Sequence, residues 1–153
     1  MTGTSGGYST PREAAQEIMR GGFTVPDGTT YTDTGLSVTL PRAGTWKVTA
    51  EVHGNISGTG PGGTALTVRL FNVTAAAVVA NSSRMVIQRT EPATGAYTLQ
   101  ATGAASGLVT VTEATVVRLE AVKPTGSGTP APVVSILSTP ALGYTTLSYE
   151  RVA

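Results

Sequence analysis

The chain of 153 residues contains no cysteine, so it can form neither a disulfide framework nor a metal site built on thiolates. Only 12% of the residues are charged, and the ten Lys and Arg residues nearly balance the nine Asp and Glu residues, leaving a net charge of +1. So little charge provides no field to attract nucleic acid or an anionic membrane, and neither partner is expected. The length suits one domain held together by packing.

Long apolar runs are also missing, since no stretch approaches the roughly 20 residues of a membrane-spanning helix. Residues 1–8 are rich in Gly, Ser and Thr, without the basic start and apolar run of a secretory signal. We therefore expect a soluble chain that is not exported.

Residues that commonly carry catalysis are scarce. His53 is the sole histidine and lies at the end of a predicted strand on its polar face, so a triad or zinc site would need distant partners. Asp27 and Asp33 flank an oxygen-rich loop that could hold calcium, but the sequence Pro-Asp-Gly around Asp27 is typical of a turn. We favour the turn.

Two glutamates, Glu113 and Glu120, could be considered a glycosidase pair. Glu113 lies in a predicted turn, and Glu120 alternates with Arg118 on one face of a predicted strand, which favours a solvated ion-pairing face. The chain is therefore expected to have no catalytic residues, no metal and no cofactor. The four strand arginines are spread over several predicted strands without interleaved aromatic residues, so they are at most interface contacts: Arg69, Arg84, Arg89 and Arg118.

The N-terminal region has the start and stop signals of a helix. Thr10 suits the N-cap, Pro11 the first helical position and Glu13 the capping box, while Gly21 and Gly22 end the pattern. A helix of about ten residues is marginal alone in water and needs a surface to pack on. We expect residues 1–22 to form an arm with a short helix, whose small apolar set is Ala14, Ala15, Ile18 and Met19.

From Phe23 onward the pattern alternates between apolar and polar residues, with Gly, Pro, Asn and Asp between the runs. Residues 45–53 are the clearest case, with Trp46 beginning the apolar face. About ten antiparallel strands are expected in residues 23–153, which favours an all-β sandwich of two sheets in the jelly-roll class. Turns are expected at residues 58–63, 91–95, 103–107 and 124–132.

Some apolar residues face away from the expected core. Phe71 lies opposite the inward residues of its strand, and the last strand places Leu147 and Tyr149 against Tyr144. These are either scattered surface residues, which need no explanation, or parts of a subunit interface. Both interpretations stay open.

The sequence of residues 44–52, Gly-Thr-Trp-Lys-Val-Thr-Ala-Glu-Val, resembles the early core strand of trimeric jelly rolls related to the C1q and tumour-necrosis-factor domains. Residues 64–73, 108–112, 115–121 and 144–152 resemble later strands of the same domains. The resemblance covers residues 23–153 and implies a trimeric jelly roll, with Phe71 and the last-strand residues as interface candidates.

The Ala-, Thr-, Gly- and Val-rich composition, the N-terminal arm and the β domain without chemistry also resemble tailed-bacteriophage virion proteins of the decoration or head-fibre type. This resemblance implies a homotrimer on the capsid surface that reinforces the shell, with the major capsid protein as partner. The arm would dock on the capsid through Pro11, Arg12, Ala15, Ile18 and Met19. The alternative is a receptor- or glycan-binding tail or fibre module that stacks Tyr31, Tyr97 or Tyr144 on host-surface sugars.

Overall fold

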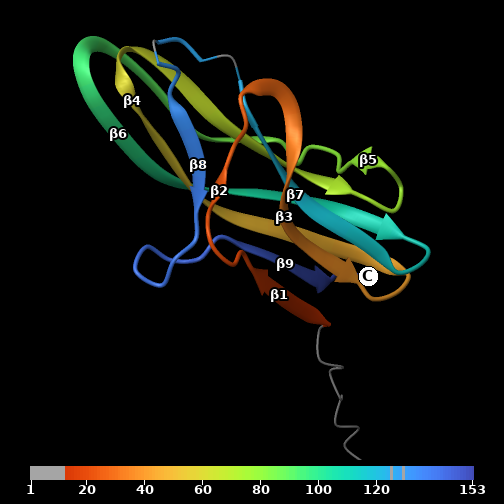
Figure 1. Cartoon of the computed structure of the whole chain (residues 1–153). Coiled ribbons are helices and arrows are strands. Elements are labelled where there is room, and N and C mark those ends of the chain that lie inside the picture. The colour runs from red at the N-terminus through yellow and green to blue at the C-terminus, as the bar shows by residue number, and fades with distance from the viewer. Residues whose placement is uncertain (1–12, 125, 129) are drawn as a thin grey trace, which may run out of the picture.

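The computed structural model describes residues 13–124, 126–128 and 130–153, and these residues form an all-β jelly-roll sandwich (Figure 1). No helix occurs among them, and in particular none long and apolar enough to cross a membrane. The strands are β1 (Ala14–Ile18), β2 (Phe23–Thr24), β3 (Gly28–Leu40), β4 (Gly44–Asn72), β5 (Ala77–Val78), β6 (Arg84–Val111), β7 (Thr115–Lys123), β8 (Val133–Leu137) and β9 (Thr146–Arg151).

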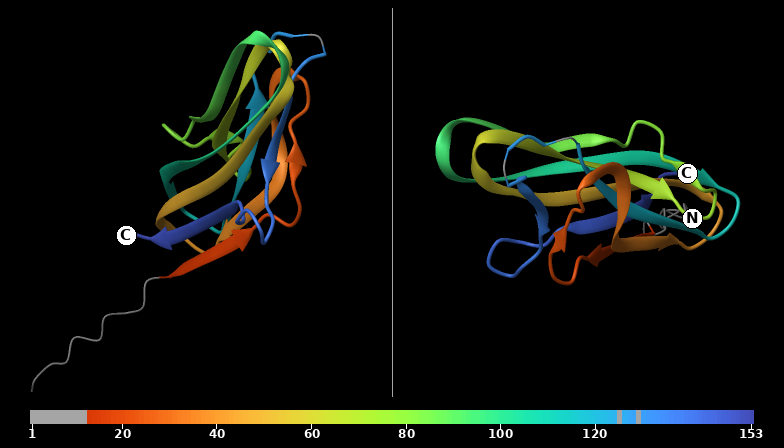
Figure 2. Two further views of the ribbon diagram at one scale, coloured as in Figure 1. Left: turned by 90° about the vertical axis from the view of Figure 1, so that its left-hand side faces the viewer. Right: turned by 45° about the horizontal axis from the view of Figure 1, so that its top comes forward.

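A long ribbon of two strands, β4 and β6, passes through both layers of the sandwich. Residues 44–60 of β4 pair with residues 95–111 of β6, and residues 62–68 of β4 pair with residues 84–91 of β6. The ribbon curls over at the shift in register between Gly60 and Gly62. This bend is at the top in Figure 1 and in the left view of Figure 2, and at the left in the right view of Figure 2. The turns expected at 58–63 and 91–95 are this bend, and the two strands stay paired on both sides of it.

The turn expected at residues 103–107 is wrong, because these residues continue β6 opposite residues 48–52 of β4. The glycines that suggested a turn serve close packing instead. A Cβ atom on Gly107 would lie 2.6 Å from Cγ1 of Val79, which leaves no room for a side chain. A glycine inside a strand often marks such a close approach.

The hydrogen-bonded strands fold over into two layers. The β9 layer contains β1, β2, β8, β9 and the paired residues 44–60 and 95–111 of the ribbon. The β7 layer contains β3, β7, β5 and the remaining half of the ribbon. The N-terminal and C-terminal strands β1 and β9 lie side by side in the first layer (Figure 1).

Alternating residues of both layers fill the core between them. Trp46 is fully buried, donates from Nε1 to the carbonyl of Arg42 at 3.2 Å and meets the ring of Tyr149 edge-on at 5.3 Å. The other large, fully buried side chains are Leu40, Ile56, Leu66, Leu70, Leu119, Ile136, Leu147, Val48, Val52, Val68 and Val117.

The expected N-terminal helix is wrong over the residues that the structure describes. Ala14–Ile18 forms strand β1, which pairs antiparallel with β9 from Ala14 opposite Glu150 to Ile18 opposite Thr146. Pairing along the edge of β9 satisfies more backbone groups than a short helix with few apolar contacts. Residues Thr10, Pro11 and Arg12, which carry the helix start signals, lie outside the described residues.

Met19 ties this segment into the sandwich. Its side chain is only 5% exposed, its amide donates to the carbonyl of Thr145 at 2.8 Å, and its carbonyl accepts from Oγ of Ser138 at 2.7 Å. Residues 13–19 therefore pack as part of the β domain and not as a detached arm.

We predict that deleting residues 1–20 lowers the free energy of unfolding by about 3 kcal/mol, because β1 and the buried Met19 are lost. Deletion of residues 1–12, which keeps the whole of β1, is the matched control and should change it little. Urea denaturation of the two shortened chains measures the difference. Equal stability of both would contradict the structural role of β1.

Candidate functional site

The outer face of the β7 layer carries a cluster of polar and aromatic side chains, here called the arginine cluster: Tyr31, Asp33, Arg69, Phe71, Arg118 and Glu120. Strand alternation places them there, because Val68 and Leu70 of β4 and Leu119 of β7 point into the core. The register of the sheet then sets Arg69 opposite Glu120 and Phe71 opposite Arg118.

The Glu120 carboxylate is the centre of the cluster. Arg69 Nε donates to Oε1 at 2.8 Å, and Arg118 donates to Oε2 from Nη2 at 2.7 Å and from Nε at 3.0 Å. Arg118 Nη1 also reaches Oδ2 of Asp33 on β3 at 3.4 Å. Although Glu120 points outward, its side chain is only 3% exposed, because the two arginines cover it.

Aromatic rings hold the two guanidinium groups in place. The Arg69 guanidinium lies 3.9 Å from the centre of the Tyr31 ring, and that of Arg118 lies 4.9 Å from the centre of the Phe71 ring. These cation–π contacts add to the ion pairs and restrict the rotamers of both arginines. The side chains stay 24% and 28% exposed, so the cluster presents ordered arginine and aromatic surface to solvent.

The remaining sequence candidates for chemistry are separated in the structure. Asp27 forms an ion pair with Nζ of Lys123, whereas Asp33 accepts from the Gly35 amide at 2.8 Å and from Arg118. Glu113 is exposed in the turn after β6. No group of three His, Cys, Asp or Glu residues that could hold a metal occurs within the described part of the chain.

His53 lies on the outer face of the β9 layer, apart from these carboxylates. It pairs with Thr102 of β6 on one side and with Leu137 of β8 on the other. A Cβ atom on Gly143 would lie 3.2 Å from its Nε2 atom, so the loop after β8 packs against the imidazole.

The four residues predicted for a trimer interface have different environments. Phe71 belongs to the arginine cluster, and Tyr144 is 40% exposed in the loop before β9. Leu147 is fully buried within the single chain, so its assignment to an interface is wrong. Tyr149 is half-buried against Trp46, because Leu147 and Tyr149 share the inward face of β9.

The predicted docking residues of the arm are similarly divided. Ala15 and Ile18 are exposed on β1. Met19 is buried in the core, so its assignment to a docking surface is wrong. Pro11 and Arg12 lie outside the described residues.

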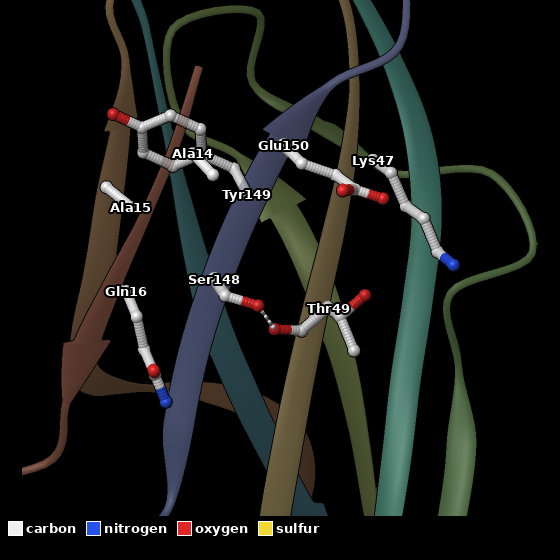
Figure 3. A pocket seen from close by; sticks show the side chains of 8 residues that line it. All are labelled: Ala14, Ala15, Gln16, Lys47, Thr49, Ser148, Tyr149 and Glu150. Carbon is white, nitrogen blue, oxygen red and sulfur yellow. Dashed lines mark hydrogen bonds between the residues drawn. The ribbon is translucent and has the colours of Figure 1, made fainter. Parts of the chain in front are cut away.

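A shallow hollow across β1, β9 and β4 brings Ala15 and Tyr149 together, since β1 pairs with β9 (Figure 3). Ser148 Oγ donates to the Thr49 carbonyl across its floor at 3.3 Å. Its lining is otherwise Ala14, Gln16 and the oppositely charged neighbours Lys47 and Glu150. This mixture of short and polar side chains resembles a protein contact surface more than a catalytic pocket.

The three tyrosines considered for sugar stacking do not form one platform. Tyr31 is covered by the guanidinium of Arg69, and Tyr97 is buried near the bend of the ribbon. Tyr144 lies in the loop between β8 and β9, strands of the β9 layer, whereas Tyr31 belongs to β3 of the other layer. Sugar binding by stacked tyrosines therefore has no assembled site among the described residues.

We predict that Glu120→Gln lowers the free energy of unfolding by about 3 kcal/mol, because two partly buried arginines lose their shared carboxylate. Glu113→Gln makes the same charge change at an exposed turn and should cost less than about 0.5 kcal/mol. Equilibrium denaturation at pH 7 compares them. A loss no larger than that of Glu113→Gln would show that the cluster does not hold β3, β4 and β7 together.

Glu13, next to β1, gives a pH-dependent contribution to stability. A side-chain hydrogen bond from Arg42 holds its pKa below the ordinary value of 4.5, with further Coulombic attraction from Arg42 and Arg151. A lowered folded-state pKa stabilises the fold above pH 4.5, and the contribution is lost as the pH falls through the folded-state pKa.

Glu13→Gln should therefore reduce the loss of stability between pH 5 and pH 3 relative to the parent chain. Glu17→Gln, an exposed change on the adjoining strand β1, is the control. Denaturation midpoints across this pH range measure the slope, and an unchanged slope in Glu13→Gln would contradict the assignment.

No protein-family model matches the sequence, and no curated protein does. Solved structures with similar folds include the VP2 subviral particle of infectious bursal disease virus, at 17% identity and a TM-score of 0.42. That match covers 94% of this chain and 38% of VP2, so the chain spans less than two fifths of the viral protein. Eiger TNF from S. frugiperda is 13% identical with a TM-score of 0.45, and 94% of each chain is covered. Both likenesses concern the fold alone.

Proposed function

We propose that the protein is a non-enzymatic structural virion protein that forms homotrimers and decorates and stabilises a bacteriophage capsid surface. The observation that carries the proposal is the arginine cluster, which exposes ordered arginine and aromatic side chains on a sheet face. Arginine and aromatic residues are enriched at protein interfaces and dominate their binding energy. Phe71, one of the predicted interface residues, lies within this cluster.

The interface candidates that reach the surface, half-buried Phe71 and exposed Tyr144, fit a head-to-tail trimer. Phe71 is on the β7 layer, whereas Tyr144 is in the loop that precedes β9 of the other layer. A ring of three protomers joins two different patches of each chain, unlike a two-fold dimer, which joins one patch to itself. Binding of such a trimer only to assembled capsomers would stabilise the shell by mass action.

The proposed lack of enzymatic activity is supported by the partners of the acidic residues. Asp27, Asp33 and Glu120 are each engaged by a lysine or an arginine. A carboxylate held in this way is a poor general base or metal ligand. The alternative function, a receptor- or glycan-binding tail or fibre module, would need a sugar site other than the separated tyrosines.

Light scattering on the purified protein tests the trimer. We expect three times the chain mass of 15.5 kDa. Phe71→Ala should weaken trimerisation about tenfold, as expected for an aromatic residue at an interface centre. Val152→Ala, at an exposed apolar residue outside the arginine cluster, is the control. A parent protein that stays monomeric would contradict the homotrimer.

Co-sedimentation with bacteriophage capsid shells tests the decoration role separately. The trimer should pellet with intact shells and raise their resistance to heat. Unassembled major capsid protein is the comparison, because decoration depends on the assembled lattice. Binding to host-surface glycan without binding to shells would favour the tail or fibre alternative.

A further inference from the structure

The outer edge of β6 is unpaired. The other side of this strand is bonded to β4, and no other strand among the described residues pairs with it. The edge runs along the outside of the ribbon on the left of Figure 1 and is visible again in Figure 2. Its backbone N–H and C=O groups are therefore available to another chain.

The other edges of the sandwich carry the features that discourage pairing. β1 and β2, at the far side of the β9 layer, are short, and β3 has two register shifts and the charged Asp33. In contrast, residues 95–111 of β6 pair with β4 without a register shift and contain no charged side chain. Natural proteins protect open edges with short strands, bulges or charges, and this edge lacks all three.

The side chains along this edge are also suited to strand pairing. Those that face outward are short or uncharged: Thr98, Gln100, Thr102, Ala104, Ser106 and Leu108. Facing inward, Leu99 and Ala101 are packed against the core but only partly buried. An added strand would extend the layer beside them and cover more of their apolar surface.

We propose that this edge pairs antiparallel with the same edge of a second copy, which joins two β9 layers into one continuous sheet across a two-fold axis. An uncharged strand meets its own copy without like-charge repulsion at any register. A two-fold contact needs one self-complementary patch, which a single regular edge provides. The contact uses neither Phe71 nor Tyr144, so it is independent of the proposed trimer and can link trimers.

Single cysteines provide a direct test, because the native chain has none and every disulfide must arise from the introduced residue. Cysteine is placed in turn at Thr98, Gln100, Thr102, Ala104 and Ser106, with Gln16→Cys on β1 as the control. Mild oxidation should give covalent dimers with a maximum at one position and a decline on both sides. Cross-linking no greater than at Gln16, or equal at all five positions, would overturn the proposal.

Charge provides the second test. Thr102→Lys combined with Ala104→Lys places like charges on both copies of the edge and should raise the dimer dissociation constant at least about tenfold. Ala14→Lys combined with Gln16→Lys adds the same charge to the opposite edge and should leave it unchanged. Light scattering and far-ultraviolet circular dichroism report association and folding.

The two proposals fail in different ways. If light scattering shows that the parent chain doubles its mass, and the Thr102→Lys, Ala104→Lys variant does not, edge pairing is supported whether or not a trimer forms. If the parent chain and the lysine variant both have the mass of three chains and no more, edge pairing is refuted and the proposed trimer is still supported.

Discussion

The continuous pairing of β4 with β6 organises both layers of the sandwich. Because the two strands stay hydrogen-bonded on both sides of their bend, one ribbon supplies the central strand of each layer. β8 and β9 then add to one half of β4, and β7 adds to the other half. Glycine makes the bend possible, since a Cβ atom on Gly60 would lie 2.0 Å from the carbonyl oxygen of Ala93.

The two outer faces differ because the ribbon brings different sequences to each layer. On the β7 layer, long charged and aromatic side chains satisfy one another in the arginine cluster around Glu120. On the β9 layer, β6 contributes short uncharged side chains up to an open edge. The outer face of the β7 layer thus carries a preorganised set of arginines, while the β6 edge of the β9 layer has unpaired backbone groups. Interaction through side chains and interaction through strand addition are physically separate in this molecule.

The candidate site was only partly predictable from the sequence. The pairing of Arg118 with Glu120 follows from their spacing on one strand face, and it is confirmed. The expectation that this face is solvated is wrong for Glu120, because the two arginines bury its carboxylate. The register between β3, β7 and β4 brings Arg69, Tyr31 and Asp33 next to this pair. No local pattern in the sequence indicates that register. The inward orientation of Leu147 depends on the same kind of information. Leu147 and Tyr149 share one face of the last strand as expected, but only the packing of the two layers makes that face the inner one.

The all-β class, the jelly-roll sandwich and most of the alternating core, including Trp46 and its neighbours on β4, could be predicted from the amino-acid sequence. These features rest on a period of two residues, which is local. Three features depend on contacts between distant segments: Ala14–Ile18 is a strand, the glycines at 103 and 107 lie within β6, and the outer edge of β6 stays open. Strong capping signals favour a helix near the N-terminus, but backbone pairing along β9 and burial of Met19 outweigh a local preference worth little on its own.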